Sequence, residues 1–299
     1  MKIIERNLQE IGKSLFVSLP KDWTRTLKLK KGSKIKMTMS DQGNLIISPE
    51  FLKKDSNKTS TIDFDENFGR NFFRDYFHGS GKITINIPTD IKEKSLKSIY
   101  SFLEKFMNTQ IIEETASKIV VKSFKIEELS IEECLKRMQY ISSDMIDEAL
   151  GKNSKTKINE LEKSLTKFYF ILVMQIRRFL DEGKFTQENQ ISLTRALDFR
   201  MAGEKIERVS DIIKDFPDIT NKEVSKILER TNELYQKSFA SFVNKNYEKS
   251  LELSNKSELQ DLQKLKNKAL KSKDLALQSQ VINLDRILDY VKEIYSLTR

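Results

Sequence analysis

The sequence predicts a mainly α-helical protein with a small β domain at its N-terminus and a small α/β domain in the middle. Residues 127–299 carry apolar side chains at three- and four-residue steps almost throughout, which is the period of helices that bury one face. Residues 1–50 instead show short alternating apolar stretches separated by turn residues. Only 9 Gly and 4 Pro occur in 299 residues, which favours long helices.

The composition, 38% hydrophobic and 32% charged, is typical of a folded protein with ample core material. The longest strongly apolar run, residues 168–174, is far shorter than the ~20 residues of a membrane helix, so we expect no membrane insertion. The single cysteine, Cys134, excludes an intramolecular disulfide and fits the reducing cytoplasm. Because His78 is the only histidine, a Cys/His zinc cluster is also excluded, and we expect that the protein is not an enzyme.

Positive charge is concentrated at the N-terminus. The whole chain has a net charge of +9, and residues 1–50 contain 10 basic and 5 acidic side chains, which leaves +5 in one sixth of the chain. A local excess of this kind indicates a polyanion partner such as DNA. The alternative is a solvated lysine-rich surface without a partner.

Residues 1–50 are predicted to form a β domain too small to enclose a core, since domains below ~60 residues bury little surface. Pro20 ends the first strand and suits the start of a helix, and Lys31-Gly32 suits a turn. The predicted elements are a strand over 15–19, a helix over 20–27, and two strands over 33–39 and 45–48 around a hairpin turn at 41–44. Two interleaved copies would supply the missing core, so we expect a homodimer.

Residues 51–61 are polar without an apolar period and are predicted to be a linker. Residues 62–124 then predict a small α/β domain in the order helix, strand, helix, strand, strand. Its expected elements are a helix over 65–77, a strand over 82–87, a helix over 91–106, and strands over 109–113 and 118–122. The loop at 78–81 is predicted to be a turn, with small-ligand binding as the alternative.

Residues 127–299 predict an antiparallel bundle of six helices, which Pro217 divides into two halves of three. The helices are expected at about 128–152, 157–182, 187–214, 221–244, 247–272 and 275–297.

The two halves of the bundle share an acidic signature, which makes them an internal repeat. Glu207 and Asp211 in the third helix correspond to Asp285 and Asp289 in the sixth, at an offset of 285 − 207 = 78 residues, and an Arg follows the first acid each time. Like charges at i,i+4 disfavour a helix by ~0.2–0.5 kcal/mol per pair. A hard cation would offset that repulsion, because such ions prefer carboxylate oxygens. The alternative is pairing with neighbouring Lys and Arg as solvated salt bridges.

Residues 1–50 resemble the swapped-hairpin DNA-binding domain of the AbrB/MazE/SpoVT superfamily. The resemblance lies in Glu10-Ile11-Gly12-Lys13-Ser14, Val17-Ser18-Leu19-Pro20-Lys21-Asp22-Trp23, Leu29-Lys30-Lys31-Gly32-Ser33 and Asn44-Leu45-Ile46-Ile47-Ser48-Pro49. The version with VSLPKDW is similar to the one that precedes archaeal PhoU-type phosphate regulators. The resemblance implies that basic strand and loop residues face DNA, and the matching positions are Arg6, Lys13, Ser14, Lys21 and Arg25.

The acidic signature resembles the [ED]-R-[IV]-x-D motif of PhoU proteins, which regulate phosphate transport and signalling and consist of two three-helix repeats. This resemblance implies a PhoU-like bundle in which Glu207, Asp211, Asp285 and Asp289 bind divalent or ferric metal ions. The chain departs from the family at Ile212 and Tyr290, where His is frequent, and at Thr166, where an acid is usual.

Together, these resemblances imply a DNA-binding transcriptional regulator of phosphate uptake, in which the bundle senses or relays phosphate status. The expected partners are DNA, a second copy of the chain, and a phosphate transporter or signalling protein. The main alternative is a PhoU-like adaptor that acts by protein contact without specific DNA binding. An antitoxin comes third, because it predicts a disordered toxin-binding tail after residue 50, and a carboxylate metalloenzyme comes last.

Overall fold

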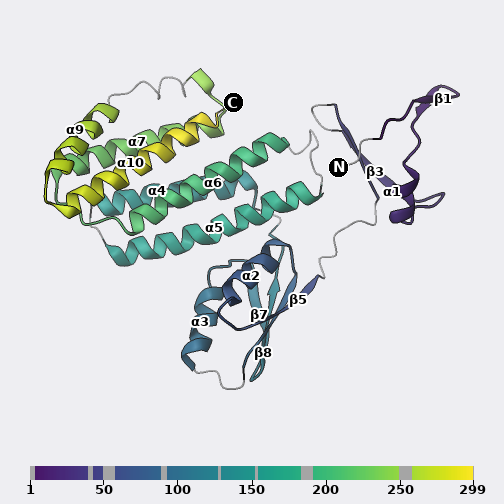
Figure 1. Ribbon diagram of the computed structural model, residues 1–299, viewed down its shortest axis with the longest axis horizontal. Helices are drawn as coiled ribbons and strands as arrows, with labels where there is room; N and C mark the ends of the chain where they lie inside the picture. Colours follow the sequence, from purple (N-terminus) through teal and green to yellow (C-terminus); the bar gives the residue numbers. More distant parts are fainter. Residues whose placement is uncertain are drawn as a thin grey trace. The chain divides into compact units, whose positions relative to one another are not determined.

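The fold is mainly α with a small β region at the N-terminus, as predicted (Figure 1). The computed structural model describes residues 4–39, 43–49, 58–88, 93–126, 129–151, 154–182, 191–248 and 258–298. These residues divide into two units, of which one contains strands β1 to β4 and helix α1, and the other contains the elements from β5 to α10.

The first unit consists of two short antiparallel hairpins and one helix. Strand β1 (Gln9–Ile11) pairs with β2 (Ser14–Phe16), α1 (Lys21–Thr26) follows, and β3 (Ile35–Met39) pairs with β4 (Leu45–Pro49). The helix and the second hairpin lie where the sequence predicts them, although residues 41 and 42 of the expected turn lie outside the described residues.

The first hairpin differs from the prediction. The expected strand over 15–19 is shorter and begins earlier, because Ser14–Phe16 pairs back on β1 through a turn at Gly12. Gly12 has φ +65°, a conformation that glycine adopts without strain. Because Gln9 and Glu10 are polar, β1 shows no alternation of apolar side chains, and the sequence does not predict it.

The α/β part of the second unit has a four-stranded sheet in the order β5-β6-β8-β7. Its elements are β5 (Thr59–Asp63), α2 (Phe68–Phe77), β6 (Lys82–Asn86), α3 (Glu93–Leu103), β7 (Thr109–Thr115) and β8 (Lys118–Ser123). Strands β5 and β6 are parallel and the other pairs are antiparallel.

Strand β5 is a correction to the predicted linker over 51–61. Thr59 to Thr61 form the start of this strand, which pairs with β6 from Thr59 to Asp63. Only Ile62 of β5 is an apolar residue in the core, so the strand shows no apolar period. Residues 51–57 of the predicted linker lie outside the described residues.

The bundle helices lie at the predicted positions. They are α4 (Ile131–Leu150), α5 (Lys155–Glu182), α6 (Leu193–Lys214), α7 (Lys222–Val243), α9 (Glu258–Lys271) and α10 (Leu275–Ser296). Residues 187–190 and 249–257 of the expected third and fifth helices lie outside the described residues. No described helix has the length and apolar character needed to cross a membrane.

Helices α4 and α10 each pack against both α6 and α7, and α9 packs against α7 and α10. Helix α5 approaches α6 at Gly203, where an added Cβ would lie 2.3 Å from Cδ2 of Leu172. Glycine at this position therefore permits the close contact between the two helices.

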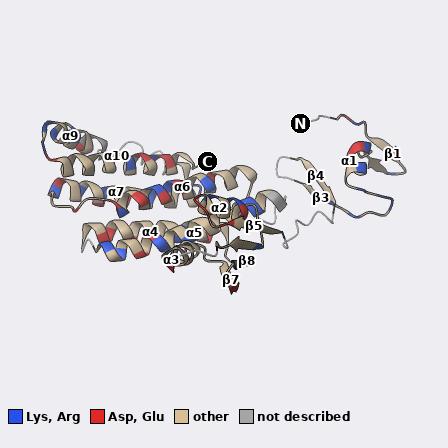
Figure 2. Ribbon diagram, turned by 60° about the horizontal axis from the view of Figure 1, so that its bottom comes forward, with Lys and Arg blue, Asp and Glu red and all other residues tan. Residues whose placement is uncertain are grey.

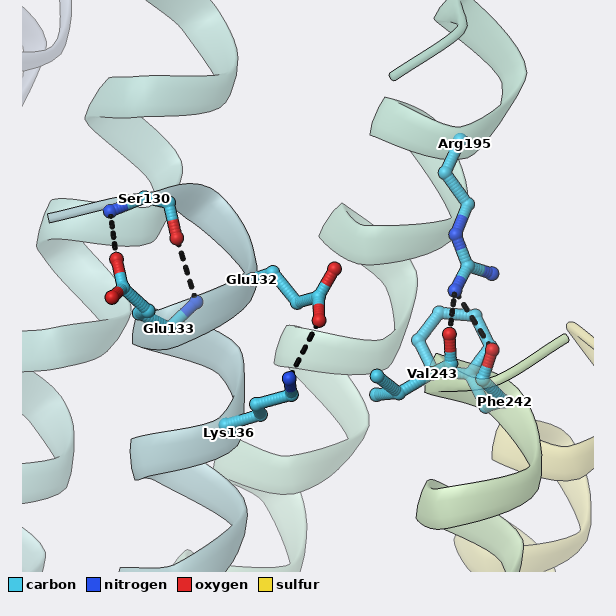
Figure 3. Close-up of polar contacts among 7 residues, drawn as sticks. All are labelled: Ser130, Glu132, Glu133, Lys136, Arg195, Phe242 and Val243. Atoms are coloured by element: carbon cyan, nitrogen blue, oxygen red, sulfur yellow. Dashed lines mark hydrogen bonds and ion pairs between the residues drawn. The ribbon is translucent and has the colours of Figure 1, made fainter. Parts of the chain in front are cut away.

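Buried Arg195 fastens the start of α6 to the end of α7 (Figure 3). Its Nη2 donates to the carbonyls of Phe242 at 2.7 Å and Val243 at 3.4 Å, which satisfies C-terminal groups that the helix leaves unpaired. The guanidinium also lies over the rings of Phe199 and Phe242, 4.5 and 4.2 Å from their centroids. A capping box between Ser130 and Glu133 begins α4 in the same view.

Candidate nucleic-acid interface

The five predicted DNA-contacting residues lie at three places on the first unit. Lys13 and Ser14 occupy the β1–β2 turn and the start of β2, while Lys21 and Arg25 occupy the first and last turns of α1. Arg6 precedes β1, and its Nη1 donates to the carbonyl of Glu5 at 3.4 Å. Figure 2 marks the basic residues of α1 in blue on the ribbon.

All five side chains are exposed, and within the described residues none of the four basic ones forms an ion pair. Free ammonium and guanidinium groups can neutralise phosphates and release counterions, which is the main source of affinity for DNA. The geometry therefore leaves these groups available to phosphates.

The first unit has almost no core of its own. Among residues 4–39 and 43–49, only Thr38 and Pro49 are buried. Large apolar side chains are instead exposed on the strands and beside them, and they include Leu8 (63%), Ile11 (61%), Leu15 (68%) and Met39 (73%). Contiguous exposed apolar surface on strands that lack neighbours is an interaction surface or a source of aggregation.

The predicted metal ligands of the first bundle repeat lie close to a third acid. Glu207 and Asp211 stand one turn apart on α6, and Glu162 of α5 acts electrostatically on both of them. Lys214 bridges the group, with its Nζ 3.5 Å from Glu162 and 4.0 Å from Asp211. Thr166, at the position where the resemblance to PhoU proteins would imply an acid, donates to Glu162 at 3.1 Å.

The pKa of Glu207 is raised to about 7. Burial of the carboxyl group is the main cause, and the negative charge of Asp211 adds to it. Burial also raises the pKa of Asp211, while Lys214 lowers it. This repeat thus contains carboxylates that its neighbouring cations neutralise incompletely.

In the second repeat, the acids form ion pairs with lysines. Asp285 lies 2.5 Å from Lys266 of α9, and Asp289 lies 3.1 Å from Lys292. Further along α10, Glu293 pairs with Lys205 of α6 at 2.6 Å. These ammonium groups stand where a bound cation would otherwise be needed.

Over the part of the chain that the structure describes, no group of three or more His, Cys, Asp or Glu side chains lies in an arrangement that could hold a metal ion. The pairs Glu207/Asp211 and Asp285/Asp289 lie on different helices and each has its own lysine. Metal binding at these four residues stays a prediction from the resemblance.

The sequence alternative of salt bridges included Lys205 and Lys292, which pair with Glu293 and Asp289. It missed Lys266, because this lysine lies on a different helix from Asp285. Sequence patterns also missed the entry of Phe170 of α5 into the core of the α/β part. The apolar run at 168–174 could have indicated the contact of Phe170 with this core.

Residues 8–56 match the family described as "Antidote-toxin recognition MazE, bacterial antitoxin". The match spans both hairpins and α1, and it supports the N-terminal DNA-binding domain predicted from the sequence. It includes Lys13, Ser14, Lys21 and Arg25, whereas Arg6 precedes it. No curated protein and no solved structure shows significant similarity to the chain.

Proposed function

We propose that the protein is a dimeric DNA-binding transcriptional regulator whose N-terminal unit reads DNA. The observation that carries this proposal is that residues 8–56, which match a MazE antitoxin domain, expose both unpaired basic groups and apolar strands. A second copy would cover the apolar strands, and two copies would present two sets of cations to a duplex. Exposed Leu15 and Met39 mark the surface that we expect the second copy to bury.

The test is binding of the full-length protein to promoter DNA from its own genome, measured by fluorescence anisotropy at two salt concentrations. Charge reversal at Arg6, Lys13 and Arg25 to Glu should abolish site-specific binding. It should also reduce the slope of log affinity against log salt concentration by about one for each lost phosphate contact. The matched control reverses Lys163, Lys226 and Lys271, which are exposed and unpaired within the described residues and change the net charge equally.

Specific binding that survives the triple reversal, or that the control removes just as well, would contradict the assignment of these residues. An absence of specific binding in the unmodified protein would instead favour the adaptor, in which the first unit only dimerises. The promoters tested should include those of phosphate-transport genes.

An antitoxin is the second candidate, because the matched family is described as one. Such a protein would need a toxin-binding segment after residue 50 that folds on contact with its toxin. The described residues from 58 onward already form a sheet and helices with a shared apolar core. Limited proteolysis of the full chain distinguishes the two, since an antitoxin tail is cut rapidly throughout and a regulator is protected within the described helices and strands from β5 to α10.

The finer part of the proposal is a role in phosphate homeostasis. It rests on the resemblance of the repeated acidic signature to PhoU proteins, with a phosphate transporter or signalling protein as the partner of the bundle. The experiment is transcript profiling of a deletion strain in high and low phosphate. Phosphate-transport transcripts that no longer respond to phosphate would support this role, and an unchanged response would exclude it while leaving DNA binding intact.

A further inference from the structure

A cavity of about 360 Å³ opens between α3, β7 and the bundle helix α5. This is within the range of roughly 300–1,000 Å³ that is common for small-molecule pockets. Leu103, Phe106, Ile111 and Val121 form the apolar part of its lining, which we call the floor, while other lining side chains are polar and Glu104 and Lys167 supply charged groups. The α/β part contributes every one of these residues except Lys167, which comes from α5.

The floor of the cavity belongs to the core of the α/β part. Phe106 is 3% exposed and stacks on Phe170 of α5, with ring centroids 5.1 Å apart and an interplanar angle of 24°. The ring of Tyr76 lies edge-on to that of Phe106 at 4.7 Å. Phe106 also contacts the rings of Phe72, Phe73 and Phe102. Val121 is 1% exposed in the central strand β8. Such packing holds the floor in place without a ligand.

Lys167 is the exception among the half-buried lysines. Seven lysines in the described part of the chain are half-buried, and six of them pair with a carboxylate: Lys118 with Glu113, Lys136 with Glu132, Lys205 with Glu293, Lys214 with Glu162, Lys266 with Asp285 and Lys292 with Asp289. Lys167 has neither an ion pair nor a hydrogen bond within the same residues, and it is the one that lines the cavity. A partly desolvated ammonium without a counter-ion favours an anion.

We propose that this cavity binds a small monocarboxylic acid with an apolar body, of the α-amino acid or 2-oxo acid class. The carboxylate would pair with Lys167, and a branched or aromatic side chain would lie on the floor of Leu103, Phe106 and Ile111. Lys167 is the one cation among the described residues that line the cavity, and a single cation suits a monoanion better than a phosphate, which carries up to two negative charges. Glu104 distinguishes the two classes of acid. Its carboxylate would accept a hydrogen bond from the ammonium group of an amino acid, whereas an oxo acid has no such group.

The test is isothermal titration calorimetry of the full-length protein with L-phenylalanine, L-leucine and the 2-oxo acid of each. We expect at least one to bind and the Lys167→Gln variant to weaken it tenfold or more, because a hydrogen bond between charged groups contributes about 1.5–3 kcal/mol. Lys167→Arg, which keeps the charge, should retain most of the affinity. Lys163→Gln is the matched control, because it removes an exposed lysine one turn earlier on α5 that does not line the cavity.

Two results would overturn the proposal: binding of none of the four acids at millimolar concentration, or binding that Lys167→Gln leaves unchanged. The Glu104→Gln variant then distinguishes the two classes of acid, since it should weaken the binding of an amino acid and leave the binding of an oxo acid unchanged. Hydrogen exchange that slows in α3 and β7 on addition of the acid would place the bound molecule at the cavity, and slowing confined to other elements would exclude it. The proposal does not depend on DNA binding by the first unit.

Discussion

The ammonium of Lys266 on α9 lies 2.5 Å from the carboxylate of Asp285 on α10, at a position where the acidic signature predicts a metal ligand. Both side chains are about one third exposed. Asp285 therefore has a cation from its own chain, whereas Glu207, its counterpart in the first repeat, has a raised pKa and more acidic neighbours. The two repeats share a sequence pattern but differ in how their charge is balanced.

Because Lys266 neutralises Asp285, we expect the pair to stabilise the contact between α9 and α10 modestly. Lys266→Met and Asp285→Asn, alone and combined, form a double-mutant cycle, and urea unfolding should give a coupling energy of about 0.5–1 kcal/mol that falls as salt is raised. The same cycle on Lys237 and Glu233, an exposed pair 3.6 Å apart, should give a smaller value. A coupling energy of zero for Lys266 and Asp285 would mean that the pair does not form in solution.

Glu207 should make the stability of the bundle depend on pH. Its pKa is about 7 in the folded protein and near 4.5 when unfolded, so the folded state binds the proton more tightly between these values. Stability is fully present below the lower pKa and is lost as pH rises through about 7. After allowance for partial solvent exposure, we expect the loss to be about 1 kcal/mol.

The Glu207→Gln variant should therefore gain stability over the unmodified protein at pH 8 and little at pH 5, measured by urea unfolding with EDTA present. Glu229→Gln, at an exposed position of α7, is the control and should change stability equally at both pH values. A Glu207→Gln effect that does not vary with pH would refute the raised pKa. Added divalent metal at pH 8 should stabilise the unmodified protein, and not the variant, if the first repeat binds a cation.

Gly203 of α6 lies in close contact with Leu172 of α5. A Cβ there would lie 2.3 Å from Cδ2 of Leu172, so Gly203→Ala should destabilise the protein by about 1–3 kcal/mol despite the better helix propensity of alanine. Gly69→Ala in α2 is the matched control, since its Cβ would meet Phe102 at 3.4 Å, and it should be neutral or slightly stabilising. The free energy of unfolding of both variants is measured by urea denaturation.

If Leu172 causes the clash, the shorter side chain of Leu172→Ala should reduce the cost of Gly203→Ala in the double variant. Strict additivity would show that the helices are further apart than the structure places them.

The bundle and most of the α/β part could be predicted from the sequence, because each helix buries a long apolar stripe and strand β6 alternates clearly. Strand β5 could not, since one core residue, Ile62, gives no visible period. The contacts that define the candidate sites also escaped prediction. Lys167 lines a cavity formed by another part of the fold, and Lys266 meets Asp285 across two helices. Pairings of this kind depend on packing, which local patterns do not encode.

The exposed apolar strands of the first unit make dimerisation the most direct prediction for it. Leu15 is 68% exposed and lies in the first unit, so Leu15→Glu should leave the second unit folded while placing charges in an interleaved dimer contact, and it should raise the dissociation constant at least ~100-fold. Sedimentation equilibrium measures this. Leu270→Glu on α9 is the control, because it places the same charge at a residue that is 79% exposed outside the first unit, and it should remain dimeric.

Two results would count against this account of the first unit. One is an unmodified protein that stays monomeric at high concentration, which would leave the apolar strands without a second copy to cover them. The other is a Leu15→Glu protein that dimerises as well as the Leu270→Glu control, which would place the contact elsewhere. Where the dimer is lost, specific DNA binding should be lost with it, because one unit alone offers half of the cations and no fixed spacing between half-sites.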